Sequence, residues 1–384
     1  MSLVTDRWLA DSDPEKRKTL GQYMTPIAVR DRLIDKVELF EGQRVLDPGV
    51  GTGEFLRSVI DREPGVVATG WDIDQEVLTY TAELAPEAKL QCRQTLGDSE
   101  EQFDLIIGNP PYFQISGSAL REKFSAVISG RANIFACFIQ ASLDLLVDGG
   151  QLAFVVPPSM NSGSYFQNLR QEILRQGSIV DLEILSGSDL FEGATTAIQL
   201  IVIRKGSHSD NFVFRHGKTT LFSENPDELN RAFRGKKALW ELGYVAKTGT
   251  VVWNQHRENL REERSGSSIR LIWSKDLSYE SLMADDGRKK WIEGVSRAPE
   301  AVLVNRIVGQ VGSGALRVQL SPDDPYCAEN HVNMIIARKD VGQEVSRERL
   351  AVLLRDPGVT ARVRMITGNT QISATELTHL LPLG

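Results

Sequence analysis

The sequence predicts an α/β protein in which helices cover both faces of a mostly parallel sheet, followed by a second domain of mixed structure. Three observations support this fold class. Short apolar runs alternate with helical patterns through the first 200 residues, a glycine-rich loop follows the first run, and the chain has 384 residues. Such alternation is typical of parallel sheets with crossover helices. Because one hydrophobic core rarely serves more than about 250–300 residues, two domains are expected.

Each predicted strand is a short apolar segment that stops at a turn-forming or polar residue. Two helices are predicted from apolar residues at helical spacing, Ile134–Leu146 and Leu169–Gln176, and Asp148-Gly149-Gly150 is a strong terminator after the first. In chain order, the predicted strands are Arg44–Asp47, Val66–Asp72, Lys89–Cys92, Phe103–Gly108, Gln151–Val156, Ile179–Leu185 and Ala197–Arg204.

A polar break, Gly206-Ser207-His208-Ser209-Asp210, marks the expected domain boundary. The first domain is therefore predicted to span residues 1–205 and the second residues 206–384. Beyond the break the pattern shows short strands and many turns without a repeat, and it does not define individual elements.

The distribution of charge differs between the two halves of the chain. Residues 1–203 hold 17 Lys and Arg against 29 Asp and Glu, a net charge of −12, and residues 204–384 hold 27 against 22, a net charge of +5; together these give −7. The second half is therefore the better candidate for a surface that faces phosphates. An excess of five over 181 residues also fits ordinary solvation, so both interpretations stay open.

The composition indicates a cytoplasmic protein that does not enter membranes. The sequence has no apolar run of the roughly 18 residues that a membrane helix needs, and its start has no apolar segment typical of a secretion signal. The three cysteines, Cys92, Cys137 and Cys327, lie too far apart to suggest a metal site or a disulfide framework.

The glycine-rich loop Asp47-Pro48-Gly49-Val50-Gly51-Thr52-Gly53 follows the first predicted strand. Glycines allow a tight turn and the close approach of a nucleotide. The spacing matches neither a dinucleotide-binding loop nor a phosphate loop. About 20 residues further on, Asp72 ends the second strand, where a carboxylate can accept hydrogen bonds from ribose hydroxyls. Together they predict a nucleoside site, although Asp72 or Asp74 could instead cap the next helix.

The segment Asn109-Pro110-Pro111-Tyr112 follows the fourth strand, at the sheet edge where ligands bind in open α/β folds. Two prolines stiffen the backbone and remove two donors. The loop offers an amide oxygen, a bare carbonyl and an aromatic face. Two acceptors can bind the N–H groups of an aromatic amine and favour the form in which its nitrogen attacks a methyl group. These residues therefore predict catalysis on an amino group rather than a proline turn.

At these residues the sequence resembles the N6-adenine DNA methyltransferases, in particular their TaqI-like gamma class. The resemblance covers about residues 17–204 and includes Gly21-Gln22-Tyr23-Met24-Thr25-Pro26, the glycine loop, Gly70-Trp71-Asp72-Ile73-Asp74 and the Asn109–Tyr112 segment. It implies a Rossmann-like seven-stranded methyltransferase sheet with one antiparallel strand and a C-terminal target-recognition domain. It also implies S-adenosylmethionine as cofactor, double-stranded DNA as substrate and a cognate restriction endonuclease as a candidate partner.

The resemblance further implies roles for single residues. Thr25 and Asp47 would lie near the methionine end of the cofactor, Asp72 would bind its ribose and Ile73 would pack on its adenine. The whole implied cofactor set is Thr25, Asp47, Gly49, Gly51, Gly53, Asp72, Ile73, Gln94 and Phe138. Gln94 stands where the family usually has an aspartate, so this contact is in doubt, and Asp98 is the alternative. Phe138, matched to an aromatic on the other face of the cofactor, fits a helix core equally well.

The implied catalytic set is Asn109, Pro110, Tyr112 and Phe191. Tyr112 and Phe191 would stack on the two faces of a base flipped out of the duplex, although a phenylalanine that anchors a loop is the alternative for Phe191. In the second half, segments beginning at Lys247, Ala328 and Gln371 resemble recurring parts of recognition domains. Two other functions stay open: an amino-group methyltransferase that acts on RNA or protein glutamine, and a DNA-binding subunit without catalysis.

Overall fold

The structure is a computed structural model, and it describes residues 1–115, 117–130, 133–185, 197–216, 219–278, 282, 287–306, 316–366 and 371–384. By its internal contacts the chain divides into two compact units. The first comprises Met1–Asn161 and Tyr165–Pro226, and the second comprises Ser162–Ser164 and Asp227–Gly384. The hairpin of β8 (Val213–His216) and β9 (Thr219–Phe222) belongs to the first unit, although it lies beyond the predicted boundary at residue 205.

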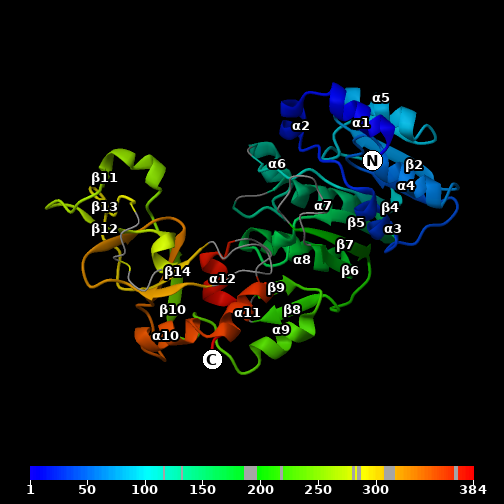
Figure 1. The fold of residues 1–384 in the computed structure, drawn as a ribbon. Coiled ribbons are helices and arrows are strands. Elements are labelled where there is room, and N and C mark those ends of the chain that lie inside the picture. The colour runs from blue at the N-terminus through cyan, green and yellow to red at the C-terminus, as the bar shows by residue number, and fades with distance from the viewer. Residues whose placement is uncertain are drawn as a thin grey trace. The chain divides into compact units, whose positions relative to one another are not determined.

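The first unit contains a seven-stranded sheet in the order β3-β2-β1-β4-β5-β7-β6 (Figure 1). All neighbours pair in parallel except β7, which is antiparallel to both β5 and β6. The strands are β1 (Arg44–Asp47), β2 (Val67–Asp72), β3 (Lys89–Cys92), β4 (Phe103–Gly108), β5 (Leu146–Val156), β6 (Gly177–Leu185) and β7 (Ile198–Lys205). The predicted fold class is confirmed, and all seven predicted strands are present with small differences at their ends.

The largest of these differences is at the start of β5. The helix α7 (Ile134–Leu145) ends as predicted, but β5 begins directly after it, at Leu146. The predicted terminator, which contains Gly149 at φ 83°, lies inside the strand. There it produces an irregularity in the pairing of β4 with β5, between Phe103 and Leu105.

Two hydrophobic cores cover the two faces of this sheet. Leu105 and Ile107 of β4 belong to one core, whereas Ile106 between them belongs to the other. This alternation follows from the two-residue period of a strand. The first core includes residues of α3, α4 and α5, and the second includes residues of α7 and α8. The helices of the first unit are α1 (Leu3–Asp11), α2 (Pro14–Leu20), α3 (Ile27–Ile34), α4 (Glu54–Arg62), α5 (Gln75–Leu84), α6 (Ser118–Lys123), α7 (Ile134–Leu145) and α8 (Gln167–Gln176).

The second unit contains two small sheets, β10-β17-β14-β15 and β11-β13-β12-β16. The first is antiparallel, and the second contains the parallel pair β12–β16. Its strands are β10 (Tyr244–Thr248), β11 (Leu260–Arg261), β12 (Ile269–Ile272), β13 (Trp291–Ile292), β14 (Val302–Asn305), β15 (Val318–Leu320), β16 (Tyr326–Ala328) and β17 (Val332–Ala337). Its helices are α9 (Pro226–Phe233, which begins at the contact boundary), α10 (Arg347–Leu354), α11 (Pro357–Ile366) and α12 (Ala374–His379).

Five short 3₁₀ helices complete the description, at Pro158–Met160, Ser164–Phe166, Trp253–Gln255, Arg257–Asn259 and Ser274–Ser278. Within the described ranges, no helix has both the length and the apolar character that crossing a bilayer would require.

Candidate active site

The glycine-rich loop connects β1 to α4 and needs glycine at two positions. Gly51 has φ 52° and Gly53 has φ 89°, both in the left-handed region that side chains disfavour. A Cβ atom on Gly53 would also lie 2.7 Å from Cγ2 of Thr81. Gly53 is the N-cap residue of α4, so the glycine-rich loop ends where that helix begins.

The sequence leaves open whether Asp72 or Asp74 caps the next helix, and the structure gives this role to Asp74. Asp74 caps α5, since its side chain accepts a hydrogen bond from the backbone N–H of Glu76 at 3.2 Å. The Asp72 carboxylate accepts hydrogen bonds from the backbone N–H groups of Gly51 at 3.0 Å and Asp74 at 2.9 Å. Asp72 therefore joins the end of β2 to the glycine loop, and burial raises the pKa of its carboxyl group.

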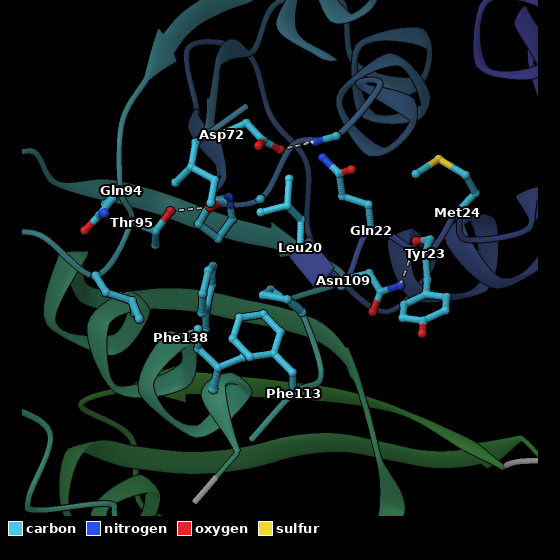
Figure 2. A pocket seen from close by; sticks show the side chains of 18 of the residues that line it. Leu20, Gln22, Tyr23, Met24, Asp72, Gln94, Thr95, Asn109, Phe113 and Phe138 are labelled. Atoms are coloured by element: carbon cyan, nitrogen blue, oxygen red, sulfur yellow. Dashed lines mark hydrogen bonds between the residues drawn. The ribbon is translucent and has the colours of Figure 1, made fainter. Parts of the chain in front are cut away.

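A cavity opens at the carboxyl ends of β1, β2 and β4, and Figure 2 shows its side chains. Seven of the predicted site residues line it: Gly49, Gly51, Asp72, Ile73, Gln94, Asn109 and Phe138. Thr25, Asp47, Gly53, Pro110 and Tyr112 lie outside the lining. Phe191 falls outside the described residues. The sequence analysis gave no individual role to the remaining lining residues: Leu20, Gly21, Gln22, Tyr23, Met24, Pro48, Thr95, Leu96, Pro111, Phe113, Leu120 and Ile134.

Some of these additional residues lie within or next to motifs that the sequence analysis quoted. Gly21–Met24 belong to the N-terminal motif, but nothing in their pattern shows that they reach the cavity. Thr95 follows Gln94, and its hydroxyl donates a hydrogen bond to the carbonyl oxygen of Pro48 in the glycine loop. This bond ties the segment after β3 to the loop after β1.

The cavity combines apolar and polar walls. Ile73 is 54% exposed although it is apolar, whereas Phe138 is only 8% exposed. Both border the cavity, together with the Asp72 carboxylate. Gln22 also lines it, and Oε1 of Gln22 is buried without a hydrogen-bond partner among the described residues. An unpaired buried acceptor is costly, so it indicates a place where a ligand could donate a hydrogen bond.

Asp47 is buried below the cavity and is 2% exposed. Burial raises the pKa of Asp47 to about 8; a hydrogen bond from the N–H of Gly49 at 3.1 Å opposes this shift, and repulsion from Asp72 adds to it. Gly108 of β4 makes room for the carboxylate, because a Cβ atom there would lie 2.7 Å from Oδ1 of Asp47. A neighbouring positive charge would reverse the shift by favouring the ionised carboxylate.

The side chain of Asn109 is held from both ends. Its amide nitrogen, Nδ2, donates to Oγ1 of Thr25 at 3.0 Å and to the backbone carbonyl of Tyr23 at 3.4 Å. Its amide oxygen, Oδ1, accepts a hydrogen bond from the hydroxyl of Tyr112, which also lies 2.6 Å from the carbonyl oxygen of Val155. The Asn109 amide is thus fixed at the edge of the cavity with its oxygen on the Tyr112 side.

Tyr112 is half-buried beside Asn109. Its ring contacts Phe135 edge-on, with 6.2 Å between centroids and an angle of 88° between planes. Burial raises the pKa of its phenol well above the ordinary range, so the hydroxyl remains a hydrogen-bond donor. The anchored hydroxyl fixes the direction of the ring.

Three segments of the second unit that the sequence analysis marked lie together. Thr248 of β10 pairs with Asn333 of β17, and the side chain of Asn333 donates to the carbonyl oxygen of Ile372 at 3.1 Å. Nearby in the chain, ring nitrogen Nδ1 of His331 is hydrogen-bonded to the carboxylate of the buried Glu329. The described residues of both units contain no group of three or more His, Cys, Asp or Glu side chains arranged to hold a metal.

Comparison with known proteins identifies the relatives of the chain. Residues 69–191 match the family described as Eco57I restriction-modification methylase. The chain is 28% identical to Modification methylase CviBIII of Paramecium bursaria Chlorella virus NC1A, over 52% of this chain and 54% of that protein. It is 23% identical to Type II methyltransferase M.PstI of Providencia stuartii, over 96% of this chain and 88% of that protein. Among solved structures, the M protein of the type I restriction enzyme EcoKI aligns with a TM-score of 0.40 and 18% identity, over 48% of this chain and 44% of that chain.

The chain is therefore similar to modification methylases and type II methyltransferases, and S-adenosylmethionine is the cofactor that such an enzyme would use. The cavity suits this cofactor by its chemistry. Ile73 and Phe138 offer apolar surfaces to an aromatic ring, the Asp72 carboxylate offers acceptors to hydroxyl groups, and the buried carboxylates favour a cation. The alignment with CviBIII spans about half of that protein, whereas the alignment with M.PstI spans most of it.

Proposed function

We propose that this methyltransferase transfers the methyl group of S-adenosylmethionine to the N6 amino group of adenine within a specific DNA sequence. It would serve as the modification enzyme of a restriction-modification or related defence system, with a cognate restriction endonuclease as its partner. Both M.PstI and M.BsuBI, which is 23% identical over 94% of this chain, are named type II methyltransferases.

The observation that carries this proposal is the oriented amide of Asn109 on the cavity wall. Asn109 follows β4 directly, and its amide oxygen is directed away from the two acceptors that bind its nitrogen. A carbonyl oxygen has two lone pairs, so Oδ1 can accept from a substrate N–H while Tyr112 occupies the other. The neighbouring Pro110 carbonyl is the proposed second acceptor.

These two acceptors would act on the amino group in the transition state. The lone pair of an aromatic amine is delocalised into its ring, and hydrogen bonds from both N–H groups favour the tetrahedral nitrogen that attacks carbon. When bound, S-adenosylmethionine would supply the methyl group, and the oxygens of Asn109 and Pro110 would hold the two N–H groups of the acceptor, one of which would give up its proton to water. The described residues would orient the amino group and the cofactor, and no covalent intermediate with the protein is needed.

In the same proposal, the cofactor lies in the cavity with its ribose on Asp72 and its adenine between Ile73 and Phe138. Thr25 and Asp47 would lie near its methionine end, as the resemblance implies, and Gln94 or Asp98 would contact the adenine edge. The three loop glycines would allow the close approach of the cofactor to the backbone.

The target adenine must leave the duplex, because its amino group is paired inside the stack. Extrusion costs a few kcal/mol, and an aromatic stack contributes about 1–3 kcal/mol per base. Tyr112 and Phe191 are the proposed stacking residues. Residues 206–384 are the proposed recognition domain, with net positive charge that suits contact with phosphates.

The proposal is tested by supplying the purified chain with labelled S-adenosylmethionine and duplex DNA of mixed sequence, then digesting the DNA to nucleosides. The expected product is N6-methyladenine in one sequence context. Asn109→Ala should bind the cofactor nearly as well as the unaltered protein but lose more than about nine-tenths of its rate, which corresponds to at least roughly 1.4 kcal/mol of transition-state stabilisation.

Three results would overturn the proposal. Label in cytosine would show that the acceptor base is wrong, since cytosine also carries an exocyclic amino group. Label only in RNA or in glutamine of a protein would show that the substrate class is wrong. Cofactor binding without transfer to any of these acceptors would support a subunit that binds DNA but does not catalyse.

A further inference from the structure

We propose that Thr25 is a positioning residue that keeps the side-chain amide of Asn109 in the orientation needed for methyl transfer. The inference rests on the proposed function, because it takes Asn109 as the residue that binds the acceptor amino group. The hydroxyl oxygen of Thr25 accepts one amide N–H of Asn109 at 3.0 Å. The carbonyl oxygen of Tyr23 lies 3.4 Å from the same nitrogen, and Figure 2 shows this second contact.

The direction of this amide matters because its two ends have similar shapes and opposite hydrogen-bonding character. If the Asn109 amide were reversed, its NH₂ group would face the N–H donors of the substrate, and its oxygen would face the carbonyl oxygen of Tyr23. The carbonyl oxygen of Tyr23 opposes that reversal because it can only accept, whereas the hydroxyl groups of Thr25 and Tyr112 can each donate or accept. Thr25 makes the shorter contact with the amide nitrogen, so it holds the amide in place while the Tyr23 carbonyl sets its direction.

Thr25 can do this because its own position is fixed by a buried network. The residue is 5% exposed, and its backbone carbonyl accepts a hydrogen bond from Arg30 at 2.6 Å. Arg30 in turn forms an ion pair with Glu54 at 2.7 Å, and the hydroxyl of Thr5 donates to the same carboxylate at 2.7 Å. The N-terminal helix α1 and the first turn of α4 thereby support the segment that holds Asn109.

This role differs from the one that the family resemblance implies for Thr25, which is contact with the methionine end of the cofactor. Thr25 lies outside the lining of the cavity, whereas Asn109 and Tyr23 line it. The hydroxyl of Thr25 therefore acts on the cavity through the Asn109 amide. The two roles make opposite predictions: loss of the hydroxyl slows transfer in one case and weakens cofactor binding in the other.

The test compares Thr25→Val, which keeps the shape of the side chain, with Thr25→Ser, which keeps the hydroxyl. Thr25→Val should lower kcat by about tenfold or more, as expected when an interaction specific to the transition state is lost. Its KM for DNA and its Kd for S-adenosylmethionine should stay within about twofold. Thr25→Ser should retain at least about a third of kcat.

The matched control is Thr69→Val. Thr69 is also 5% exposed and lies on β2, which β1 separates from β4. This control makes the same substitution at an equally buried site. It therefore measures how much kcat falls when a buried hydroxyl that does not contact Asn109 is lost. Thermal unfolding of each variant shows whether it is folded, and Thr25→Ala replaces Thr25→Val if the latter does not fold.

A second readout needs no acceptor substrate and separates this inference from the proposed function. The side-chain amide protons of Asn109, assigned by their absence in Asn109→Ala, should exchange with solvent faster in Thr25→Val than in the unaltered protein or Thr25→Ser. Unchanged exchange, unchanged kcat, or a loss of cofactor affinity as large as the loss of rate would each overturn the role of Thr25. Failure to methylate adenine, with faster exchange in Thr25→Val, would refute the proposed function and leave the positioning role standing.

Discussion

The raised pKa of Asp47 predicts that cofactor binding is coupled to the release of a proton. In the free protein the carboxyl group, at a pKa of about 8, is mostly protonated at neutral pH. S-Adenosylmethionine brings a positive charge to the neighbouring cavity, and a nearby cation favours the carboxylate form. The pKa should therefore fall on binding, and the proton should leave.

The size of the effect follows from the fraction of Asp47 that is ionised before binding. For a pKa of about 8, that fraction is about 1 in 100 at pH 6, 1 in 11 at pH 7 and one half at pH 8. If the carboxylate is required in the complex, affinity rises about ninefold from pH 6 to pH 7 and about fivefold from pH 7 to pH 8, then levels off. At pH 7, about 0.9 proton should be released for each cofactor bound.

Calorimetry at these pH values, in buffers of different ionisation enthalpy, measures both quantities. Asp47→Asn is the reference, because it keeps the size of the side chain and corrects for the titration of the cofactor's own amino group. It should lose most of the pH dependence. Equal proton release by Asp47→Asn and the unaltered protein would refute the reasoning, as would affinity that does not change between pH 6 and pH 8.

The same group gives a prediction about stability with the opposite dependence on pH. A carboxyl group whose folded pKa lies above its unfolded value of 3.8 binds more protons in the folded state. The free energy of unfolding should therefore fall as the pH rises from about 4 to about 8, and Asp47→Asn should remove that part of the loss. Thermal unfolding without cofactor across this range shows the difference.

Two further predictions concern the residues at the ends of β2 and β4. Asp72→Ala should weaken binding of S-adenosylmethionine, because each charge-assisted bond to a ribose hydroxyl is worth about 1.5–3 kcal/mol, and unchanged affinity of a folded variant in calorimetry would contradict this role. Tyr112→Ala should reduce methylation of paired DNA more than that of DNA with a mismatch or gap at the target, where extrusion costs less. Tyr112→Phe keeps the ring but loses the hydroxyl that contacts Asn109 Oδ1 and the Val155 carbonyl, so it should show a smaller difference between the two DNA substrates than Tyr112→Ala. Equal losses of Tyr112→Ala on both DNA substrates would argue against stacking.

The sheet of the first unit could be predicted because its central strands are buried on both faces. A strand such as β4, in which five of six residues are buried, appears in the sequence as a continuous apolar run. The starts of the helices and the glycine loop provide clear boundaries between these runs. The resemblance implied one antiparallel strand without saying which, because an apolar run has the same pattern in a parallel and an antiparallel pairing; the structure identifies it as β7.

Elements that depend on tertiary contacts could not be predicted in the same way. The helix α2 buries none of its residues, and α1 buries only Thr5 and Trp8, so neither has an apolar stripe to detect. Contacts with distant residues support these helices, for example Lys16 with Asp74 at 2.9 Å. In the second unit, several strands are only two to four residues long, which is too short for a periodic pattern.

The site was predictable in its residue types and less so in its geometry. The loop residues and Asn109 stand out because glycine and consecutive prolines restrict the backbone in recognisable ways. The hydrogen bonds that hold the Asn109 amide come from Tyr23 and Thr25, more than 80 residues earlier in the chain. No local pattern contains that information.

The net charge of −7 is compatible with the proposed binding of DNA. The two halves of the chain differ in net charge, and they are proposed to bind different ligands. A cationic cofactor is favoured by carboxylates, whereas the DNA backbone is repelled by them. Asp47 and Asp72 are buried, at 2% and 8% exposure, and act most strongly on a ligand in the adjacent cavity. Exposed acidic groups elsewhere on the first unit are screened beyond about 10 Å at 0.1 M salt, so they do little to phosphates held at a greater distance. On the proposed function, the excess of positive charge in residues 204–384 would favour contact with the duplex, and the total charge of the chain would be a poor guide to its substrate.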